Sequence, residues 1–168
     1  MGGLSAAQWQ GVVLTRGGLA RLRAAAERAH PAEACGLLLA PEGVLAADPA
    51  GLRPRLRAVR CRNVHPDPGA AYEVAPRDFL RWDRLAARRG CVVAGVWHSH
   101  PGGAPVPSAS DHEQAWRGWV YLIVAGEEPD SVPRVEPEAG EGGGRSLRYA
   151  RAWCWDGSGC VELPVTAA

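Results

Sequence analysis

The apolar run Cys91–Trp97 constrains the fold more than any other stretch of this chain. It follows Gly90 directly and reads Cys-Val-Val-Ala-Gly-Val-Trp, a length typical of one strand. A run of that length without polar alternation is typical of a strand buried on both faces. It therefore predicts a central strand covered by helices, and that strand leads into His98-Ser99-His100-Pro101.

The rest of the sequence alternates between strand and helix patterns. Residues 19–30 have the apolar spacing of a helix that Pro31 ends, and a second helix begins at Pro76 and is closed by Gly90. Further strands are predicted over 12–14, 36–40, 56–61, 71–74, 120–125, 147–155 and 160–165, with 44–47 as a hairpin partner of 36–40. Strands interleaved with two longer helices predict a mixed α/β (α+β) fold, with a central mixed sheet flanked by those helices.

Length and composition predict one domain. The chain has 168 residues, of which 46% are hydrophobic, enough for a single packed core. We expect this domain to span residues 1–168, with its core over about 12–125 and closing strands over 147–165. Residues 127–145 are rich in Glu, Pro and Gly without a periodic apolar face, which predicts a polar loop.

Charge and cysteine usage exclude several classes of protein. The formal net charge is +1, so no strong basic field favours nucleic acid as a partner. The sequence shows no signal peptide, and no apolar stretch approaches the roughly 20 residues of a membrane span. Five cysteines without a CxxC pair favour buried thiols in a cytoplasmic protein, although a pairing of Cys154 with Cys160 stays open.

The segment after the central strand carries a set of metal-ligand side chains. His98 and His100 are two residues apart on a predicted strand, so both imidazoles face the same side. Ser108 and Asp111 have the spacing of a helix N-cap and its third residue, which would fix the Asp111 carboxylate near the two rings. Two imidazoles and one carboxylate leave one open position on a tetrahedral ion, as in a catalytic zinc site.

Each of these features also has a simpler explanation when it is taken alone. Two histidines at a strand end are compatible with ordinary surface residues, and Ser108 with Asp111 is compatible with a helix cap that binds nothing. Glu33, just before the apolar strand 36–40, is a solvated charge in most sequences of this kind. The zinc deaminases have a related layout, but their H-x-E and P-C-x-x-C signature is missing from this chain.

Taken together, these residues resemble the JAMM (MPN-plus) metallopeptidases, and in particular their compact prokaryotic stand-alone type. The signature of that family is a remote Glu, then H-[S/T]-H-P, six residues, Ser, two residues and Asp. Glu33, His98-Ser99-His100-Pro101, Ser108 and Asp111 fill every position with the expected spacing. The resemblance covers roughly residues 12–125 and implies the cytidine-deaminase-like JAMM/MPN fold.

The resemblance also implies a role for each residue. His98, His100 and Asp111 would bind one Zn²⁺ ion that carries a catalytic water. Glu33 would act as general base on that water and then as general acid toward the leaving amine. Ser108 would donate a hydrogen bond to the oxyanion that forms at the scissile carbonyl.

The family implies a substrate class. Its members hydrolyse the amide or isopeptide bond after the C-terminal Gly-Gly of ubiquitin-like or sulfur-carrier proteins, so we expect a metallopeptidase that releases an amino acid or removes the carrier from a conjugate. A non-catalytic MPN scaffold that binds a ubiquitin-like partner, or a zinc amide hydrolase of small peptides, stays open as an alternative. The expected partner is the carrier protein, with neither nucleic acid nor membrane, and a homodimer is also left open.

Overall fold

A mixed six-stranded sheet forms the centre of this protein. The computed structural model describes residues 9–45, 53–125 and 149–168. The elements are β1 (Val12–Leu14), α1 (Arg16–Ala29), β2 (Cys35–Pro41), the 3-10 helix η2 (Glu42–Leu45), β3 (Arg57–Cys61), α2 (Pro76–Ala87), β4 (Cys91–His100), α3 (Ala109–Gln114), β5 (Val120–Ala125), β6 (Ala150–Trp155), β7 (Cys160–Leu163) and β8 (Val165–Ala167).

The strand order in the sheet is β3-β2-β4-β5-β6-β7. Only the β4–β5 pair is parallel, and the other neighbours within this sheet are antiparallel. β1 and β8 form a separate parallel pair. The predicted mixed sheet and the α+β fold class are therefore confirmed.

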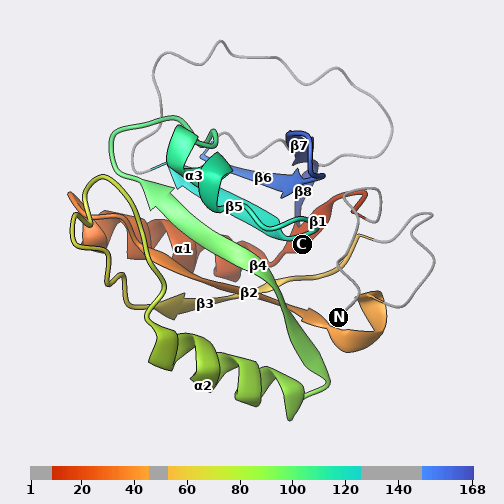
Figure 1. Ribbon diagram of the computed structural model, residues 1–168. Coiled ribbons are helices and arrows are strands. Elements are labelled where there is room, and N and C mark those ends of the chain that lie inside the picture. Colours follow the sequence, from red (N-terminus) through yellow and green to blue (C-terminus); the bar gives the residue numbers. More distant parts are fainter. Residues whose placement is uncertain (1–8, 46–52, 126–148) are drawn as a thin grey trace.

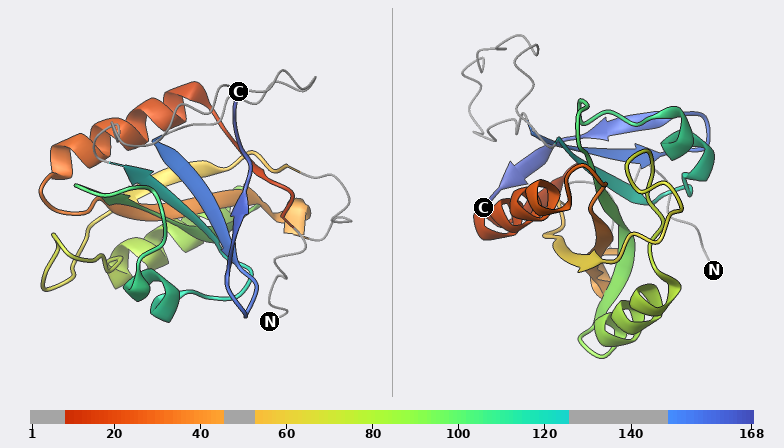
Figure 2. Two further views of the ribbon diagram at one scale, coloured as in Figure 1. Left: turned by 90° about the horizontal axis from the view of Figure 1, so that it is seen from above. Right: turned by 90° about the vertical axis from the view of Figure 1, so that its left-hand side faces the viewer.

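Two longer helices cover opposite faces of this sheet, as the views in Figures 1 and 2 show. The core on one face includes Leu19 and Leu22 of α1 packed with Leu38 and Leu122. The core on the other face is closed by α2 and includes Ala86, with Leu37, Val59 and Tyr121. Because apolar side chains are buried on both faces, the central strands read as continuous apolar runs in the sequence.

The first helix begins three residues earlier than the sequence predicts. The hydroxyl of Thr15 accepts a hydrogen bond from the backbone amide of Gly18 at 2.9 Å and caps the helix. Gly17 and Gly18 therefore lie in its first turn rather than ahead of it. The cap outweighs the poor helix propensity of two glycines because it satisfies a backbone donor that the helix leaves unpaired.

Two of the predicted strands are wrong. Of the predicted hairpin strand 44–47, residues 44 and 45 end a 3-10 helix and residues 46 and 47 lie outside the described residues, and β3 is the antiparallel partner on that side of β2. Residues 71–74 contribute only an isolated bridge between Asn63 and Val74 rather than a strand. Both segments are too short for periodicity to separate a strand from a turn.

β4 is the element that carries the predicted ligand pair, and it extends through His100. On the neighbouring β2, Gly36 has no side chain and so leaves room for the indole ring of Trp97. A Cβ atom at Gly36 would lie 1.9 Å from the carbonyl oxygen of Val59. The indole N–H of Trp97 crosses this position and donates to that same carbonyl at 2.9 Å.

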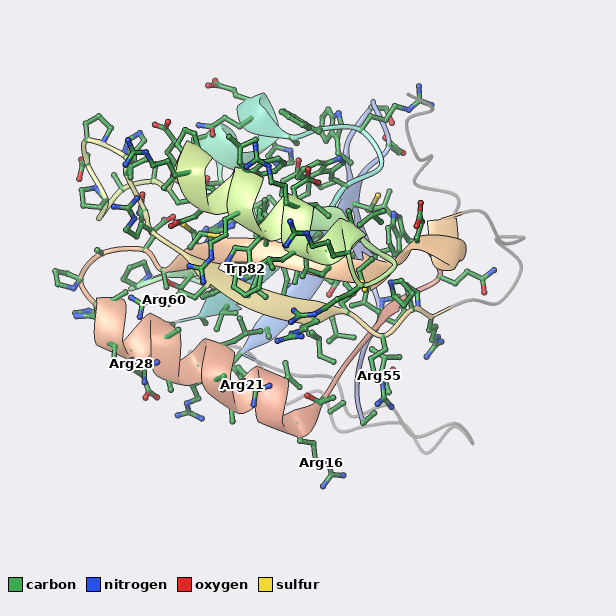
Figure 3. All side chains as sticks on the ribbon, turned by 90° about the horizontal axis from the view of Figure 1, so that it is seen from below. Arg16, Arg21, Arg28, Arg55, Arg60 and Trp82 are labelled. Carbon is green, nitrogen blue, oxygen red and sulfur yellow. The ribbon has the colours of Figure 1, made fainter. Side chains whose placement is uncertain are left out.

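The outer strand β3 is an edge that the protein protects. Figure 3 shows Arg60 and Trp82 over this strand, between α1 and α2. The indole N–H of Trp82 donates to the carbonyl of Arg60 at 3.3 Å, and the side chains of Arg57 and Arg60 are exposed. Exposed charge and a covering aromatic ring are common ways to prevent edge-to-edge pairing.

Residues 127–145, where the sequence predicts a polar loop, lie outside the described residues. The closing strands are observed as β6 and β7, joined by a turn in which the Asp156 carboxylate accepts hydrogen bonds from the amides of Ser158 and Gly159. All five cysteines are free thiols. Within the described ranges, no helix is long and apolar enough to cross a membrane.

Candidate metal centre

The end of β4 brings His98 and His100 together. The two residues lie on the same face of the strand, and their Nε2 atoms are 3.0 Å apart. His98 is fully buried, and the side chain of His100 is 13% exposed. β5 runs parallel to β4, so the chain must cross back over the carboxyl end of β4 between them. That crossover contains α3, which lies beside the end of β4 in Figure 1.

Asp111 enters the site from the first turn of α3. Its Oδ1 lies 3.2 Å from Nε2 of His98, and its Oδ2 lies 3.5 Å from Nε2 of His100. The sequence leaves open whether Ser108 and Asp111 cap a helix or serve a site. The structure shows that they form a reciprocal capping box and that the same carboxylate also faces both rings.

The spacing of these three ligands fits a tetrahedral ion. Zinc bound to nitrogen and oxygen at its usual distances places neighbouring ligand atoms about 3.4 Å apart. The two Nε2 atoms are 3.0 Å apart, and each of them lies 3.2 or 3.5 Å from one of the two Asp111 oxygens, which is close to that value. His98, His100 and Asp111 are also the group of three that could hold a metal ion among the residues that the structure describes.

A hydrogen bond of Nδ1, the ring nitrogen that faces away from His98, fixes the orientation of His100. Its Nδ1 lies 2.9 Å from the carbonyl oxygen of Ala104, an acceptor, so Nδ1 carries the proton. The lone pair of Nε2 therefore faces His98 and Asp111. The His100 lone pair, Nε2 of His98 and the Asp111 carboxylate together make an electron-rich cluster that suits a cation.

Tyr72 and burial hold His98 in place. The ring of Tyr72 stacks on it with 4.4 Å between centroids and 21° between planes. Nδ1 of His98 is buried and has no hydrogen-bond partner within the described part of the chain. Burial lowers the pKa of His98, and Asp111 opposes this only in part, so the ring is neutral, as a metal ligand must be.

Asp111 stays ionised despite its surroundings. Burial by itself raises the pKa of this carboxyl, but its interactions with His100 and His98 and the hydrogen bond from Ser108 outweigh burial and hold the pKa well below the ordinary value. The site therefore presents a carboxylate at neutral pH. A carboxylate beside two imidazoles is a donor set that zinc accepts.

Glu33 is buried rather than solvated and lies in the same cleft. Its exposed fraction is 7%, and it lines a small cleft together with Ser108, Asp111 and Tyr72. Burial raises the pKa of Glu33 to about 7, an effect that His100 reduces and Asp111 increases. A carboxyl with a pKa near neutrality can both accept and return a proton at physiological pH.

The pairing of β2 with β4 brings Glu33 to the site. The two strands are antiparallel and Cys35 is opposite His98, so the start of β2 lies beside the end of β4. The amide of Ser99 donates to the carbonyl of Ala34 at 2.9 Å, and the amide of Ala34 donates to the hydroxyl of Ser99 at 2.8 Å. Strand pairing thus brings residues 65 positions apart into direct contact.

Ser108 occupies the expected place, but its hydroxyl is engaged. Its Oγ donates to Oδ2 of Asp111 at 2.6 Å and accepts from the amide of Asp111 at 3.2 Å. The hydroxyl has one proton, so donation to an oxyanion would require rotation of the hydroxyl away from Asp111. Ser108 lines the cleft together with Glu33 and Asp111.

Sequence reasoning assigned no role to Asn63 or Tyr72. Tyr72 covers His98, and the side chain of Asn63 donates to the carbonyl of Glu33 at 3.1 Å. Both residues lie in the segment that connects β3 with α2. A single sequence gives no signal for them, because their partners are far away along the chain.

The fold and the cluster of three candidate ligands beside a buried glutamate suit a metal-dependent type of hydrolase. The sequence profile described as "Prokaryotic homologs of the JAB domain" matches residues 15–136, and the chain belongs to this family. The family predicted from the signature residues is thereby confirmed.

Two curated relatives and one solved structure show the extent of the similarity. The chain is 39% identical over 106 residues to the desampylase of Haloferax volcanii, covering 62% of this chain and 70% of that protein. It is 35% identical over 112 residues to a probable TtuB-protein conjugate cleaving protease of Thermus thermophilus, covering 65% and 68%. A solution structure of a protein from Desulfitobacterium hafniense matches with a TM-score of 0.71 and 24% identity over 94% of this chain and 92% of that chain. The predicted class of enzyme, a JAMM-type hydrolase, agrees with both named relatives.

Proposed function

We propose that this protein is a zinc-dependent peptidase that hydrolyses the amide or isopeptide bond after the C-terminal Gly-Gly of a ubiquitin-like or sulfur-carrier protein. The observation that carries the proposal is the position of Glu33, which is buried and shares one cleft with Asp111 and Ser108. Both named relatives act on protein conjugates, one as a desampylase and one on TtuB conjugates.

His98, His100 and Asp111 are the residues that would hold the ion. When bound, zinc supplies a Lewis acid and lowers the pKa of a coordinated water to about 7. Glu33 then accepts a proton at its carboxylate and passes it to the leaving amine, which its pKa of about 7 permits in both directions. Ser108 would turn its hydroxyl away from Asp111 and donate a hydrogen bond to the oxyanion at the scissile carbonyl.

A groove next to the cleft suits an extended carrier tail. Tyr72 and Gln114 line both the cleft and the groove, which continues along an aromatic and aliphatic wall formed by Val74, Phe79, Trp116, Trp119 and Tyr121. Residues 62–64 and 73–75 pair through backbone bonds from Val64 to Glu73 and from Ala75 to Arg62. The outer edge of residues 72–74 would pair with the tail by strand addition.

A narrow approach to the cleft explains why the tail would end in Gly-Gly. The cleft beside the cluster is small, and Tyr72 lines it while stacking on His98, so a tail without bulky side chains would fit there. The rest of the carrier would stay outside the groove. We also place the protein in the cytoplasm, on the basis of its five free thiols, and a pairing of two copies stays open.

Glu33 and the groove also argue against the two alternative functions, a non-catalytic scaffold and a small-peptide hydrolase. A non-catalytic scaffold has no need of a glutamate buried beside three metal ligands, because a desolvated carboxyl with a raised pKa lowers stability. A small-peptide hydrolase needs no groove longer than its substrate, whereas here the aromatic wall extends beyond the cleft.

The test is hydrolysis of a carrier joined through Gly-Gly to a single amino acid or to a lysine side chain. We expect the zinc-loaded protein to cleave the conjugate and a chelator to abolish cleavage. A free tetrapeptide ending in Gly-Gly amide should be cleaved far more slowly, because it lacks the contacts of the carrier. Equal rates on both substrates would favour the small-peptide hydrolase, and no cleavage by zinc-loaded protein would favour the scaffold.

A further inference from the structure

We propose that Asn63 is a positioning residue that fixes the Glu33 backbone against the segment that covers the catalytic cleft. The inference rests on the proposed function, because it concerns how that reaction obtains its base. Asn63 lies two residues beyond β3 and is partly buried. It touches the backbone of Glu33, not the reacting atoms, so its effect passes through Glu33.

The side-chain amide of Asn63 makes hydrogen bonds with both its NH₂ group and its oxygen. The NH₂ group donates to the carbonyls of Glu33 and Ala71, each at 3.1 Å. The side-chain oxygen accepts from the backbone amides of His65 at 3.0 Å and Glu73 at 3.1 Å. A primary amide offers two N–H donors and two acceptor lone pairs, so this side chain is saturated.

These contacts join two parts of the site that the sheet does not connect. Glu33 precedes the first residue of β2, so no strand ladder fixes its carbonyl. Ala71 lines the catalytic cleft, and Glu73 lines the neighbouring groove. Asn63 therefore sets the distance between the base and the segment along which the tail would lie.

Other contacts fix the remaining backbone groups around Glu33. Its own amide donates to the carbonyl of Pro68 at 2.6 Å, and Ser99 holds the amide and carbonyl of Ala34. The contact from Asn63 to the Glu33 carbonyl is the one made by a side chain of the covering segment. Without it, the carbonyl of Glu33 would lose its partner in the covering segment, and the bond from the Ala34 amide to Ser99 would be left to hold the peptide that follows Glu33. The carboxylate of Glu33 would then be less firmly positioned.

Asn63→Asp separates the two halves of this side chain. The variant keeps an oxygen to accept from His65 and Glu73, but it replaces the donors with an oxygen that faces the carbonyls of Glu33 and Ala71. We expect kcat on the carrier conjugate to fall about 10- to 100-fold, the usual loss for a residue that orients a site group. KM should change by less than about threefold, because the segment keeps its amide contacts.

Asn63→Ala removes both the NH₂ donors and the acceptor oxygen of the side chain, and it introduces no charge. We expect it to lower kcat as Asn63→Asp does and also to raise KM, since the segment that lines the groove is no longer held. Zinc content should stay at the wild-type level in both variants, because no ligand contacts Asn63. Amide hydrogen exchange should show His65 and Glu73 protected in Asn63→Asp and unprotected in Asn63→Ala.

Asp67→Asn is the matched control. Asp67 lies in the same segment with an exposed side chain, and the change again exchanges a carboxylate and an amide. We expect its kcat and KM to equal those of the wild type. If Asn63→Asp keeps wild-type kcat while it is folded and zinc-loaded, Asn63 has no positioning role. If the wild type itself does not cleave the conjugate, the proposed function fails first, so the two failures are distinguishable.

Discussion

Ser99 and Ala34 are joined by two hydrogen bonds, one from the amide of Ala34 to the hydroxyl of Ser99 and one from the amide of Ser99 to the carbonyl of Ala34. Ser99 stands between His98 and His100, and Ala34 follows Glu33 directly. Both residues are buried, with exposed fractions of 1% and 4%. This contact therefore fixes the buried glutamate relative to both ring ligands.

Replacing Ser99 with alanine should cost stability. The change leaves the buried amide of Ala34 without an acceptor, which lowers the free energy of unfolding by about 1–3 kcal/mol. Ser99→Thr keeps the hydroxyl and should stay much closer to the wild type. Urea denaturation of the metal-free proteins measures both values. An alanine variant as stable as the wild type would show that water or a rearranged chain satisfies the amide.

Ligand variants and the glutamate variant should differ in metal content. His98→Ala and Asp111→Ala each remove one of three ligands, so both proteins should contain little zinc after dialysis. Glu33→Gln leaves every ligand in place and should contain the wild-type amount. Its turnover should fall about 100- to 10,000-fold, the range for loss of a general base. Elemental analysis measures the zinc content, and hydrolysis of the conjugate measures the turnover. A Glu33→Gln variant with wild-type turnover would show that Glu33 is not the general base.

Glu33 should make the metal-free protein less stable above neutral pH. Burial raises its pKa from 4.5 to about 7, so the folded state holds the proton more tightly than the unfolded chain. The stabilising contribution is complete below pH 4.5 and is lost as the pH rises to about 7. Glu33→Gln has no charge to desolvate, so it should raise the free energy of unfolding by roughly 1–3 kcal/mol at about pH 8.

The same Glu33→Gln variant should match the wild type at about pH 4, where the wild-type carboxyl is protonated in both states. Chemical denaturation of chelator-treated proteins at the two pH values measures the difference. A stability gain that is equal at both pH values would have a cause other than the raised pKa.

Ser108 should have separate effects on stability and on rate. Ser108→Ala removes the N-cap of α3, which lowers the free energy of unfolding by about 1 kcal/mol. If Ser108 also donates to the oxyanion, the rate of the zinc-loaded variant should fall about 100- to 1000-fold. Ser110→Ala is the control, because Ser110 lines the same cleft and contacts the Ser108 hydroxyl at 3.0 Å. Equal rates for the two variants would leave Ser108 with the capping role alone.

The sequence by itself predicted the group of His98, His100 and Asp111 and most of the sheet. His98 and His100 are two residues apart on a strand and therefore share one face. Ser108 and Asp111 belong to the start of a helix, so local spacing places these four side chains. The strands around Leu37, Val96 and Leu122 are predicted by apolar runs because they are buried on both faces. The strand predictions were wrong at residues 44–45 and 71–74, where short segments take their conformation from neighbouring elements rather than from their own residues.

Only the tertiary structure decided what surrounds the ligands. Glu33 precedes a strand and reads as a solvated charge, yet the antiparallel pairing of β2 with β4 buries it beside the ligands and raises its pKa. Asn63 and Tyr72 take their roles from the same packing, since the groups that they contact lie 30 and 26 residues away, at Glu33 and His98. The physical reason is that side-chain spacing is fixed by the local backbone, whereas desolvation and long-range hydrogen bonds exist only after distant segments pack together.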